Sequence, residues 1–300
     1  LAPDGKMTTW LGSGTSAYTE GTGIAAEFME TWAAEVDQIT GTTYIADYNH
    51  VVRDVTPGGT VSTWLTTGLN KPTGLALFGT DLWIIDHNNQ AIKQATLAGP
   101  VVTTFATQPD ILKLAFSRGG ALYVTGYYTD VVVKYFPPNP TEVVLYGKYA
   151  VDGDVDGPPA DARFSNVYGV AIDSDDIVYV CDYANSKIRL ISPHNDRVTT
   201  MDHIPIATPN DIAISPSGTI YVAATGDRKL FVLNAAPTRP ELTLAVGNGV
   251  VGTTDGANPV VEIDAVKAMF YDTLSGELIT GGNNFVIRRM SPSGRITTWL

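Results

Sequence analysis

Short apolar segments separated by polar turns recur along the whole chain. The clearest example is Tyr168–Ser192, in which apolar segments at Gly169–Asp173, Ile177–Cys181 and Lys187–Ile191 follow one another. The turns between them hold Asp, Asn and Ser, whose side chains bond nearby backbone N–H groups and tolerate the left-handed conformation. Strands of about five residues at this spacing predict an antiparallel meander.

The second strand of this unit has six copies along the sequence. Their four-residue cores are Tyr44–Asp47, Trp83–Asp86, Tyr123–Gly126, Tyr179–Asp182, Tyr221–Ala224 and Leu278–Gly281. A four-stranded unit that recurs about every 40 residues is typical of a propeller blade. One meander cannot bury both of its faces, whereas a ring of meanders does so by packing blade on blade. We therefore predict an all-β fold, a six-bladed β-propeller of four-stranded antiparallel blades.

The repeat also predicts where the blades begin and end within one propeller domain that covers residues 1–300. The approximate blades are 32–65, 72–106, 110–147, 167–201, 209–247 and 265–300, with 1–11 as an extra outer or closing strand. Segment 2–11 matches segment 291–300 at six of ten positions, so both compete for the outer strand of the last blade. We expect the two ends of the chain to meet there. One strand is then surplus, or the chain is trimmed from a longer protein.

Blade four carries a resemblance to a known repeat family. The segment Tyr179–Ile191, Y-V-C-D-Y-A-N-S-K-I-R-L-I, resembles the core of an NHL repeat, and Asp156–Phe164 resembles its lead-in. The resemblance implies an NHL-like six-bladed propeller but does not define a function, because propellers host unrelated activities. Some related propellers are lyases with a central histidine cluster and a metal. Others are lactonases or strictosidine-synthase-like enzymes with acidic and Asn ligands around a tunnel metal.

Charge and composition limit the classes of partner that the protein could bind. The formal net charge is −12, which argues against a nucleic acid, since phosphate binding needs a basic surface, and favours a protein or peptide with a basic surface. No apolar run approaches the length of a membrane span, so we expect no transmembrane segment in this sequence. The single cysteine, Cys181, falls at an apolar strand position and reads as a small core residue. The acidic, lysine-poor chain suggests the ectodomain of a surface protein, with a cytoplasmic scaffold as the alternative.

The strand order predicts two unlike faces. One face, which we call the loop face, receives the connections between blades and the turns between second and third strands. The opposite face, which we call the turn face, receives only tight hairpins. Three long connections, 12–31, 147–166 and 247–264, reach the loop face, and long loops on a rigid scaffold often carry function. The predicted binding residues of the loop face are acidic or aromatic: Trp32, Tyr127, Tyr128, Asp152, Asp154, Asp156, Tyr168, Tyr183 and Phe285.

Two patterns suggest metal ligands, and each has a simpler explanation. Asp152, Asp154 and Asp156 have the spacing that opens a calcium loop, but Arg163 stands where such a loop needs a bidentate carboxylate. We interpret the segment as an acidic lead-in to the repeat. His50 and His87 follow the second strands of adjacent blades, without an evident third ligand. We interpret them as structural histidines and assign no metal ligand and no cofactor.

Five polar residues interrupt the repeat in the first strands, which are predicted to line the central tunnel. First strands of a propeller line the central tunnel, and most copies are apolar or small there. The exceptions are Glu35, Lys113, Asn210, Asp211 and Lys267. We interpret them as tunnel-lining ion pairs with trapped water, because buried charges need partners.

No nucleophile elbow, phosphate-binding loop or dinucleotide fingerprint occurs in the sequence, so we assign no catalytic residue. The expected function is a non-enzymatic binding or scaffold propeller that presents an acidic loop face to a protein or peptide. The alternative is a metal-dependent hydrolase or lyase that uses the central tunnel.

Overall fold

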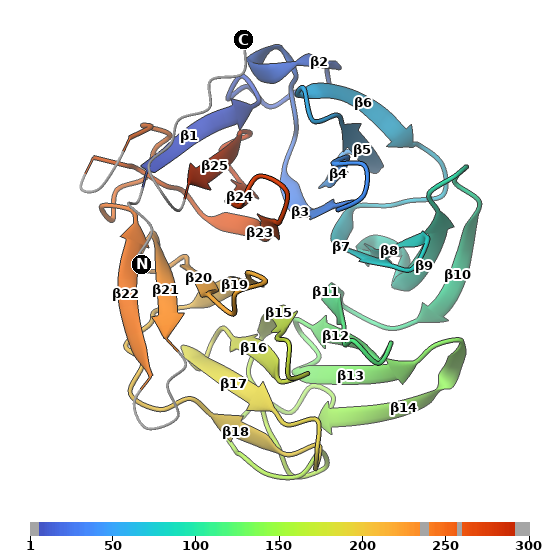
Figure 1. The fold of residues 1–300 in the computed structure, drawn as a ribbon. Helices are drawn as coiled ribbons and strands as arrows, with labels where there is room; N and C mark the ends of the chain where they lie inside the picture. Colours follow the sequence, from blue (N-terminus) through green and yellow to red (C-terminus); the bar gives the residue numbers. More distant parts are fainter. Residues whose placement is uncertain (1–5, 235–239, 257–259, 292–300) are drawn as a thin grey trace.

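The fold is a ring of six antiparallel sheets in a computed structural model, which describes residues 6–234, 240–256 and 260–291 (Figure 1). The chain is thus a six-bladed β-propeller, as the repeat predicts. Each blade runs outward from a first strand at the ring centre to a fourth strand at its rim. The small elements outside the blades are β2 (Gly21–Thr22) and the 3-10 turns η1 (Gly23–Ala25) and η2 (His87–Asn89).

The strands of each rank occupy equivalent places in the six blades. First strands are β3 (Thr31–Val36), β7 (Pro72–Phe78), β11 (Ile111–Phe116), β15 (Val167–Ile172), β19 (Pro209–Ile214) and β23 (Val266–Asp272). Second strands are β4 (Thr43–Asp47), β8 (Asp81–Asp86), β12 (Leu122–Gly126), β16 (Val178–Asp182), β20 (Ile220–Ala224) and β24 (Glu277–Gly282). Third strands are β5 (Val51–Val55), β9 (Ala91–Thr96), β13 (Val131–Phe136), β17 (Lys187–Ile191), β21 (Lys229–Asn234) and β25 (Ile287–Ser291). Fourth strands are β6 (Thr60–Leu65), β10 (Val102–Thr107), β14 (Asn139–Gly147), β18 (Val198–Thr200), β22 (Glu241–Val246) and, for the last blade, β1 (Lys6–Leu11).

The last blade is closed by the start of the chain. Strand β1 pairs antiparallel with β25, with Lys6 opposite Ser291 and Met7 opposite Met290. Such pairing joins the first and last parts of the propeller by backbone hydrogen bonds and removes a free edge from the last blade. The competing segment 292–300 lies outside the described residues.

The register of the last blade differs from the predicted one by a residue. Gly282 of β24 lies opposite Val266, as Asp182 of β16 lies opposite Val167. The equivalent of Tyr179–Asp182 is therefore 279–282, and not Leu278–Gly281 as the sequence suggested. Leu278 is apolar and buried, so in the sequence it aligns with the large residue at the first position of the other copies.

The core lies between the blades. Second strands such as β4, β12 and β16 are buried at every residue, because each packs against a neighbouring blade on both faces. One cluster joins Ile45 and Val36 of the first blade to Phe270 and Ile279 of the last, so the ring has a continuous apolar contact across its closure. A strand buried on both faces reads as an unbroken apolar run, which is the pattern that defined the repeat.

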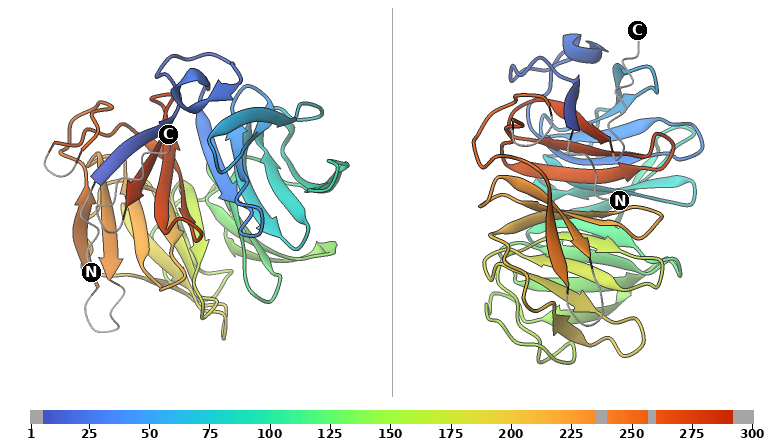
Figure 2. Two further views of the ribbon diagram at one scale, coloured as in Figure 1. Left: turned by 45° about the horizontal axis from the view of Figure 1, so that its top comes forward. Right: turned by 60° about the vertical axis from the view of Figure 1, so that its left-hand side comes forward.

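The three long connections fold over the outer edges of their blades (Figure 2). β2 pairs with the fourth strand β6, Gly157 with Val198 of β18, and Gly256 with Met7 of β1. These contacts cover edge strands that would otherwise expose unpaired backbone groups. Much of each connection is therefore structural and does not stand free above the loop face.

One buried arginine in the third strand holds each of these connections. Arg53 donates to the carbonyl oxygens of Thr19 and Glu27, Arg189 to those of Val155 and Arg163, and Arg288 to those of Thr254 and Glu262. In each pair the two carbonyls are eight residues apart. A guanidinium suits this place because it offers five donors in a planar fork.

Candidate functional site

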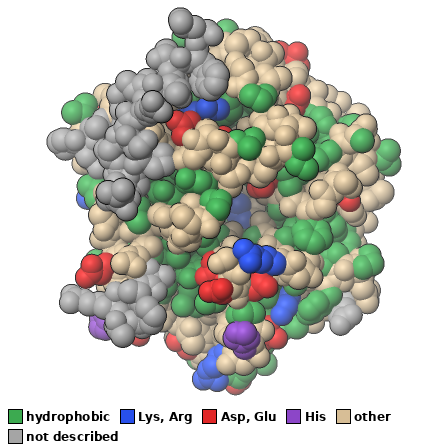
Figure 3. Space-filling model, in the orientation of Figure 1, with side chains coloured by type: hydrophobic (Ala, Val, Ile, Leu, Met, Phe, Trp, Pro, Cys, Tyr) green, Lys and Arg blue, Asp and Glu red, His purple; other side chains and the backbone are tan. Residues whose placement is uncertain are grey.

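The first strands enclose a central cavity of about 300 Å³. Its lining is made of the third to sixth residues of these strands, and the second residues, such as Tyr168 and Lys267, do not contribute. The chain runs from the loop face to the turn face along each first strand. The cavity therefore occupies the half of the tunnel that faces the turn face, whose centre is hollowed (Figure 3).

Lys113 closes the inner end of the cavity toward the loop face. Its ammonium donates to the carbonyl oxygens of Trp32 (2.5 Å) and Lys267 (2.6 Å) and forms an ion pair with Asp211 (3.2 Å). The Asp211 carboxylate also accepts from the backbone N–H of Met269 at 2.7 Å. Burial raises the pKa of Asp211, while Lys113 acts against this rise. Lys113 thus ties blade three to blades one, five and six, and its charge is satisfied within the protein.

Glu35 is the second carboxylic acid in the lining of the cavity, besides Asp211. Along the first strand its position is two residues closer to the turn face than that of Lys113. The other first strands carry Ala76, Ala115, Ala171, Ala213 and Phe270 at this position. The backbone of Leu77 acts to lower the pKa of its carboxyl group, and no cation forms an ion pair with it among the described residues. Burial raises the pKa of Glu35 to about 8.

The remaining predicted tunnel residues lie outside the cavity. Asn210 is buried and donates from its side chain to the carbonyl oxygen of Val266 at 2.6 Å, which makes it a link between blades. Lys267 forms an ion pair with Glu30 (3.2 Å), and its ammonium lies 3.8 Å from the centre of the Trp32 ring. The structure thus brings together Glu35, Lys113 and Asp211 but not all five tunnel candidates.

Four tyrosines form a continuous cluster on the loop face of blades three and four. Ring centres are 4.0 Å apart for Tyr127 and Tyr128, 4.7 Å for Tyr127 and Tyr168, and 4.6 Å for Tyr168 and Tyr183. Tyr128 is 64% exposed, and the other three are half-buried. Burial raises the pKa of Tyr168 well above its ordinary value, so this hydroxyl stays uncharged at neutral pH.

Acidic groups lie beside this tyrosine cluster. Asp130 follows it in the chain, and burial raises the pKa of its carboxyl, with a further contribution from the charge of Asp152. The pKa of Tyr128 is raised, chiefly by Tyr127 and to a smaller extent by the negative charge of Asp110. Asp152 is exposed. The loop face of blade three therefore combines aromatic rings with carboxylates.

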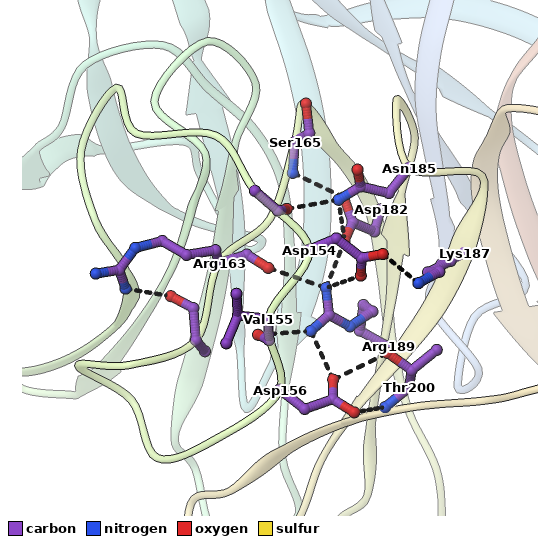
Figure 4. A network of polar contacts seen from close by, with 12 residues as sticks. Asp154, Val155, Asp156, Arg163, Ser165, Asp182, Asn185, Lys187, Arg189 and Thr200 are labelled. Carbon is purple, nitrogen blue, oxygen red and sulfur yellow. Dashed lines mark hydrogen bonds and ion pairs between the residues drawn. The ribbon is translucent and has the colours of Figure 1, made fainter.

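The other two aspartates of the predicted acidic segment bind an arginine. Asp156 accepts from Arg189 at 2.6 Å and also from Thr200, while Asp154 lies 3.6 Å from Arg189 and pairs with Lys187 (Figure 4). Hydrogen bonds from Thr200 and Arg189 hold the pKa of Asp156 below its usual value despite the cost of burial. These two carboxylates are paired with Lys187 and Arg189, so they add less to the charge of the loop face than the sequence suggests.

The remaining loop-face residues lie apart from the tyrosine cluster. Trp32 stacks on Tyr48 with ring centres 5.6 Å apart, and the ammonium of Lys71 lies over Tyr48. Phe285 is half-buried in the turn between β24 and β25, with a positive φ of 58°.

The two predicted structural histidines have backbone partners. His50 accepts from the backbone N–H of Lys71, and His87 bonds to the carbonyl oxygen of Ile111. No three His, Cys, Asp or Glu side chains gather as a metal site in the described part of the chain.

Sequence reasoning missed Tyr48 as an aromatic residue of the loop face. A signal was present, because Tyr48, Tyr127 and Tyr183 each directly follow the second strand of their blade. This position lies at the loop-face end of the second strand in every blade. Their aromatic character in blades one, three and four could have been read as a pattern.

Known structures share this fold at low sequence identity. A protein of unknown function from Bacteroides thetaiotaomicron has a TM-score of 0.74 at 15% identity, over 95% of this chain and 75% of that one. An auxiliary nutrient binding protein from the same organism has a TM-score of 0.75 at 15% identity, over 95% and 76% of the two chains. A streptogramin B lyase has a TM-score of 0.66 at 12% identity, over 91% and 96%.

No protein-family model matches the chain, and no curated protein matches it either. The similarities therefore define the class of fold, a six-bladed β-propeller, and the neighbours within this class include both binding proteins and enzymes. Among the described residues, no helix is long and apolar enough to cross a membrane.

Proposed function

We propose that this protein is a non-enzymatic binding propeller, with repeats of the NHL type, whose loop face binds a protein or peptide with a basic surface. The observation that carries the proposal is the tyrosine cluster of Tyr127, Tyr128, Tyr168 and Tyr183, which joins two blades and has an exposed member. Tyrosine is enriched in interface hot spots because it offers a large, rigid contact area with a polar end.

The carboxylates beside the cluster favour a cationic partner. Asp110 lies near the exposed Tyr128, and the exposed Asp152 lies near Asp130, and aromatic faces attract the guanidinium of arginine and the ammonium of lysine. An arginine that stacks on Tyr128 would also have the carboxylate of Asp110 nearby. The exposed acids would steer such a partner over about one Debye length of 8–10 Å, so binding should weaken with salt through a slower on-rate.

The test uses a labelled Gly-Ser peptide with spaced arginines and the same peptide with glutamine at those positions. We expect only the arginine peptide to bind, and Tyr128→Ala to weaken binding roughly threefold to thirtyfold, as the loss of one cation–π contact predicts. Ile39→Ala is the matched control, because Ile39 is exposed on the turn face. Equal affinity of the wild-type protein and Tyr128→Ala, or binding that depends on Ile39 instead, would contradict the choice of face.

The alternative function is a metal-dependent hydrolase or lyase that uses the tunnel. Elemental analysis of the purified protein distinguishes it from a binding propeller. Stoichiometric calcium or zinc that disappears in Glu35→Gln or Asp211→Asn would support an enzyme and would overturn the proposal of a pure binding protein. The fold of the streptogramin B lyase makes this measurement worthwhile.

A further inference from the structure

A groove lies on the outer rim of the ring, between blades two and three. Its volume is about 460 Å³. One wall contains Phe105 and Thr107 of β10, and the other contains Val143 and Leu145 of β14, the fourth strands of these two blades (Figure 1). The connection from β10 to β11 consists of residues 108–110. It is therefore too short to fold over the rim, as the long connections do at blades one, four and six.

The surface of the groove is mainly apolar, and its described lining residues are all uncharged. Val133 and Tyr135 of β13 form the floor and are buried, and the Tyr135 ring packs edge-on against Phe105 with ring centres 5.7 Å apart. Val143 is 47% exposed at the open side. A concave apolar surface with a few polar groups at one end is typical of a site for a small molecule.

The polar groups form a chain of hydrogen bonds at the loop-face end of the groove. The Tyr135 hydroxyl donates to the side-chain oxygen of Gln108 at 3.2 Å, and the side-chain nitrogen of Gln108 donates to the hydroxyl oxygen of Tyr149. Burial raises the pKa of Tyr135 to about 12, so this hydroxyl keeps its proton and remains a donor. The Tyr149 hydroxyl has its own proton left to donate, and no described residue accepts it. Hydrogen bonds in a chain polarise one another, which strengthens Tyr149 as a donor.

We propose that the groove binds an uncharged small molecule, in which an aromatic body lies against the apolar walls and a carbonyl oxygen accepts the hydrogen bond of Tyr149. The polar group of the ligand is an acceptor, because Tyr149 already receives a hydrogen bond from Gln108 and offers a proton. The body is aromatic, because rings pack well against Phe105 and Tyr135. The ligand is uncharged, because the described lining residues contain no partner for a charge.

The volume limits the size of the ligand and suggests a pair of probes. A cavity of about 150 Å³ holds benzene, so a groove of about 460 Å³ accommodates a molecule of about two or three rings. Benzophenone has two rings joined by a carbonyl group. Diphenylmethane has the same two rings joined by a methylene group, so it keeps the apolar body and lacks the acceptor.

Equilibrium dialysis of the two probes against the unmodified protein tests the proposal. We expect benzophenone to bind about twofold to tenfold more tightly than diphenylmethane, which is the ratio that one neutral hydrogen bond produces. If the ketone does not bind more tightly than the hydrocarbon, or if neither probe binds up to the limit of its solubility, the proposal is wrong.

Two variants locate the binding, and each has a matched control. Tyr149→Phe removes the donor and should abolish the preference for the ketone, whereas Tyr18→Phe removes a hydroxyl of equal exposure (41% against 42%) and should leave it intact. Thr107→Trp fills the groove from an exposed position and should prevent binding of both probes. Thr103→Trp, at an exposed position of β10 that does not line the groove, should bind both. A preference that survives Tyr149→Phe, or binding that survives Thr107→Trp with unchanged circular dichroism, would refute the assignment.

Two further measurements separate this site from other occupants of the groove. Light converts bound benzophenone into a group that bonds to neighbouring C–H groups, so the adduct should map to segments 105–108, 133–135 or 140–149. An adduct found only in other segments would contradict the proposal. Sedimentation tests a second copy of the chain as the occupant. A dimer that Thr107→Trp dissociates, together with no binding of either probe, would assign the groove to an interface between two copies and would overturn the small-molecule site.

Discussion

Replacement of Arg189 by lysine should loosen the long connection 147–166 without unfolding the blade. The Arg189 guanidinium is fully buried and donates to Asp182 (2.7 Å), to the carbonyl oxygen of Arg163 (2.9 Å) and to that of Val155 (2.8 Å). Lysine keeps the charge and can still reach Asp182. It cannot span two carbonyls, because its ammonium is a single point at the end of a flexible stem.

The structure allows the size of this effect to be estimated. A hydrogen bond to a charged group contributes about 1.5–3 kcal/mol, and the two carbonyls would lose such bonds. Since the ammonium and water recover part of this loss, we expect the connection to open more easily by about 2 kcal/mol, which is roughly a thirtyfold change in the opening equilibrium. Asp182 stays paired, so the larger cost of an uncompensated buried charge does not arise.

Hydrogen exchange measures this opening directly. The amides of Gly153, Gly157 and Arg163 are bonded to Phe164, Val198 and Val155, and their protection should fall roughly thirtyfold in Arg189→Lys. The amide of Glu27, which is bonded to Thr19 in the equivalent connection of blade one, should not change and serves as an internal reference. Arg197→Lys, at an exposed position of the same blade, is the matched control variant. Unchanged protection of segment 153–163 in Arg189→Lys would refute the view that the guanidinium holds the connection.

Two further predictions concern the tunnel. In Gly169→Ala the new Cβ would lie 2.8 Å from the Cα of Asp211, a backbone atom that cannot easily move, so we expect a loss of about 1–3 kcal/mol in urea unfolding. Gly99→Ala, with open space around it, should cost far less, and an equal cost of the two changes would be evidence against tight contact between the first strands. The pKa of Glu35 is about 8 in the folded protein but about 4.3 in an unfolded chain, so its contribution to stability is full below about pH 4 and is lost as pH rises through 8. Glu35→Gln should therefore gain in urea midpoint over the wild-type protein between pH 5 and pH 9, and a difference that does not vary with pH would contradict the raised pKa.

The repeat made the propeller predictable, because a strand buried on both faces needs an apolar residue at nearly every position. It also exposed Glu35, Lys113 and Asp211, since each interrupts a row of small or apolar residues in the first strands. The sequence of the first strands could not show how far along the tunnel each side chain lies or which partner it meets. Lys113 and Asp211 meet at the inner end of the cavity, whereas Glu35 has no cation beside it in the described part of the chain, and this difference depends on which residues of other blades face the tunnel.

The acidic segment shows a second limit of sequence reasoning. Asp154 and Asp156 look like free surface charges, because their partner Arg189 lies more than thirty residues away in the chain. Burial of the guanidinium decides their role, and burial follows from the packing of Phe164 at 5.1 Å from it. The spacing of acids within a loop therefore gives little information on whether the loop is a binding surface.

The length of the connection before a blade is related to the type of one residue in the third strand of that blade. This relation becomes visible only when the blades are compared with one another. The position that faces the connection is Arg53, Arg189 and Arg288 in blades one, four and six, the three blades preceded by long connections. In blades two and five, which follow short connections, the equivalent residues are Lys93 and Phe231. Lys93 forms an ion pair with Asp86 and donates to one carbonyl oxygen, that of Gly68, because no long connection lies over the edge of this blade. A long connection brings unpaired carbonyls over the edge of the blade, and only a planar guanidinium with several donors satisfies them together with the buried carboxylate. The arginines thus fix the three connections on the outer edges of their blades, while Tyr128 stays exposed on the loop face of blade three.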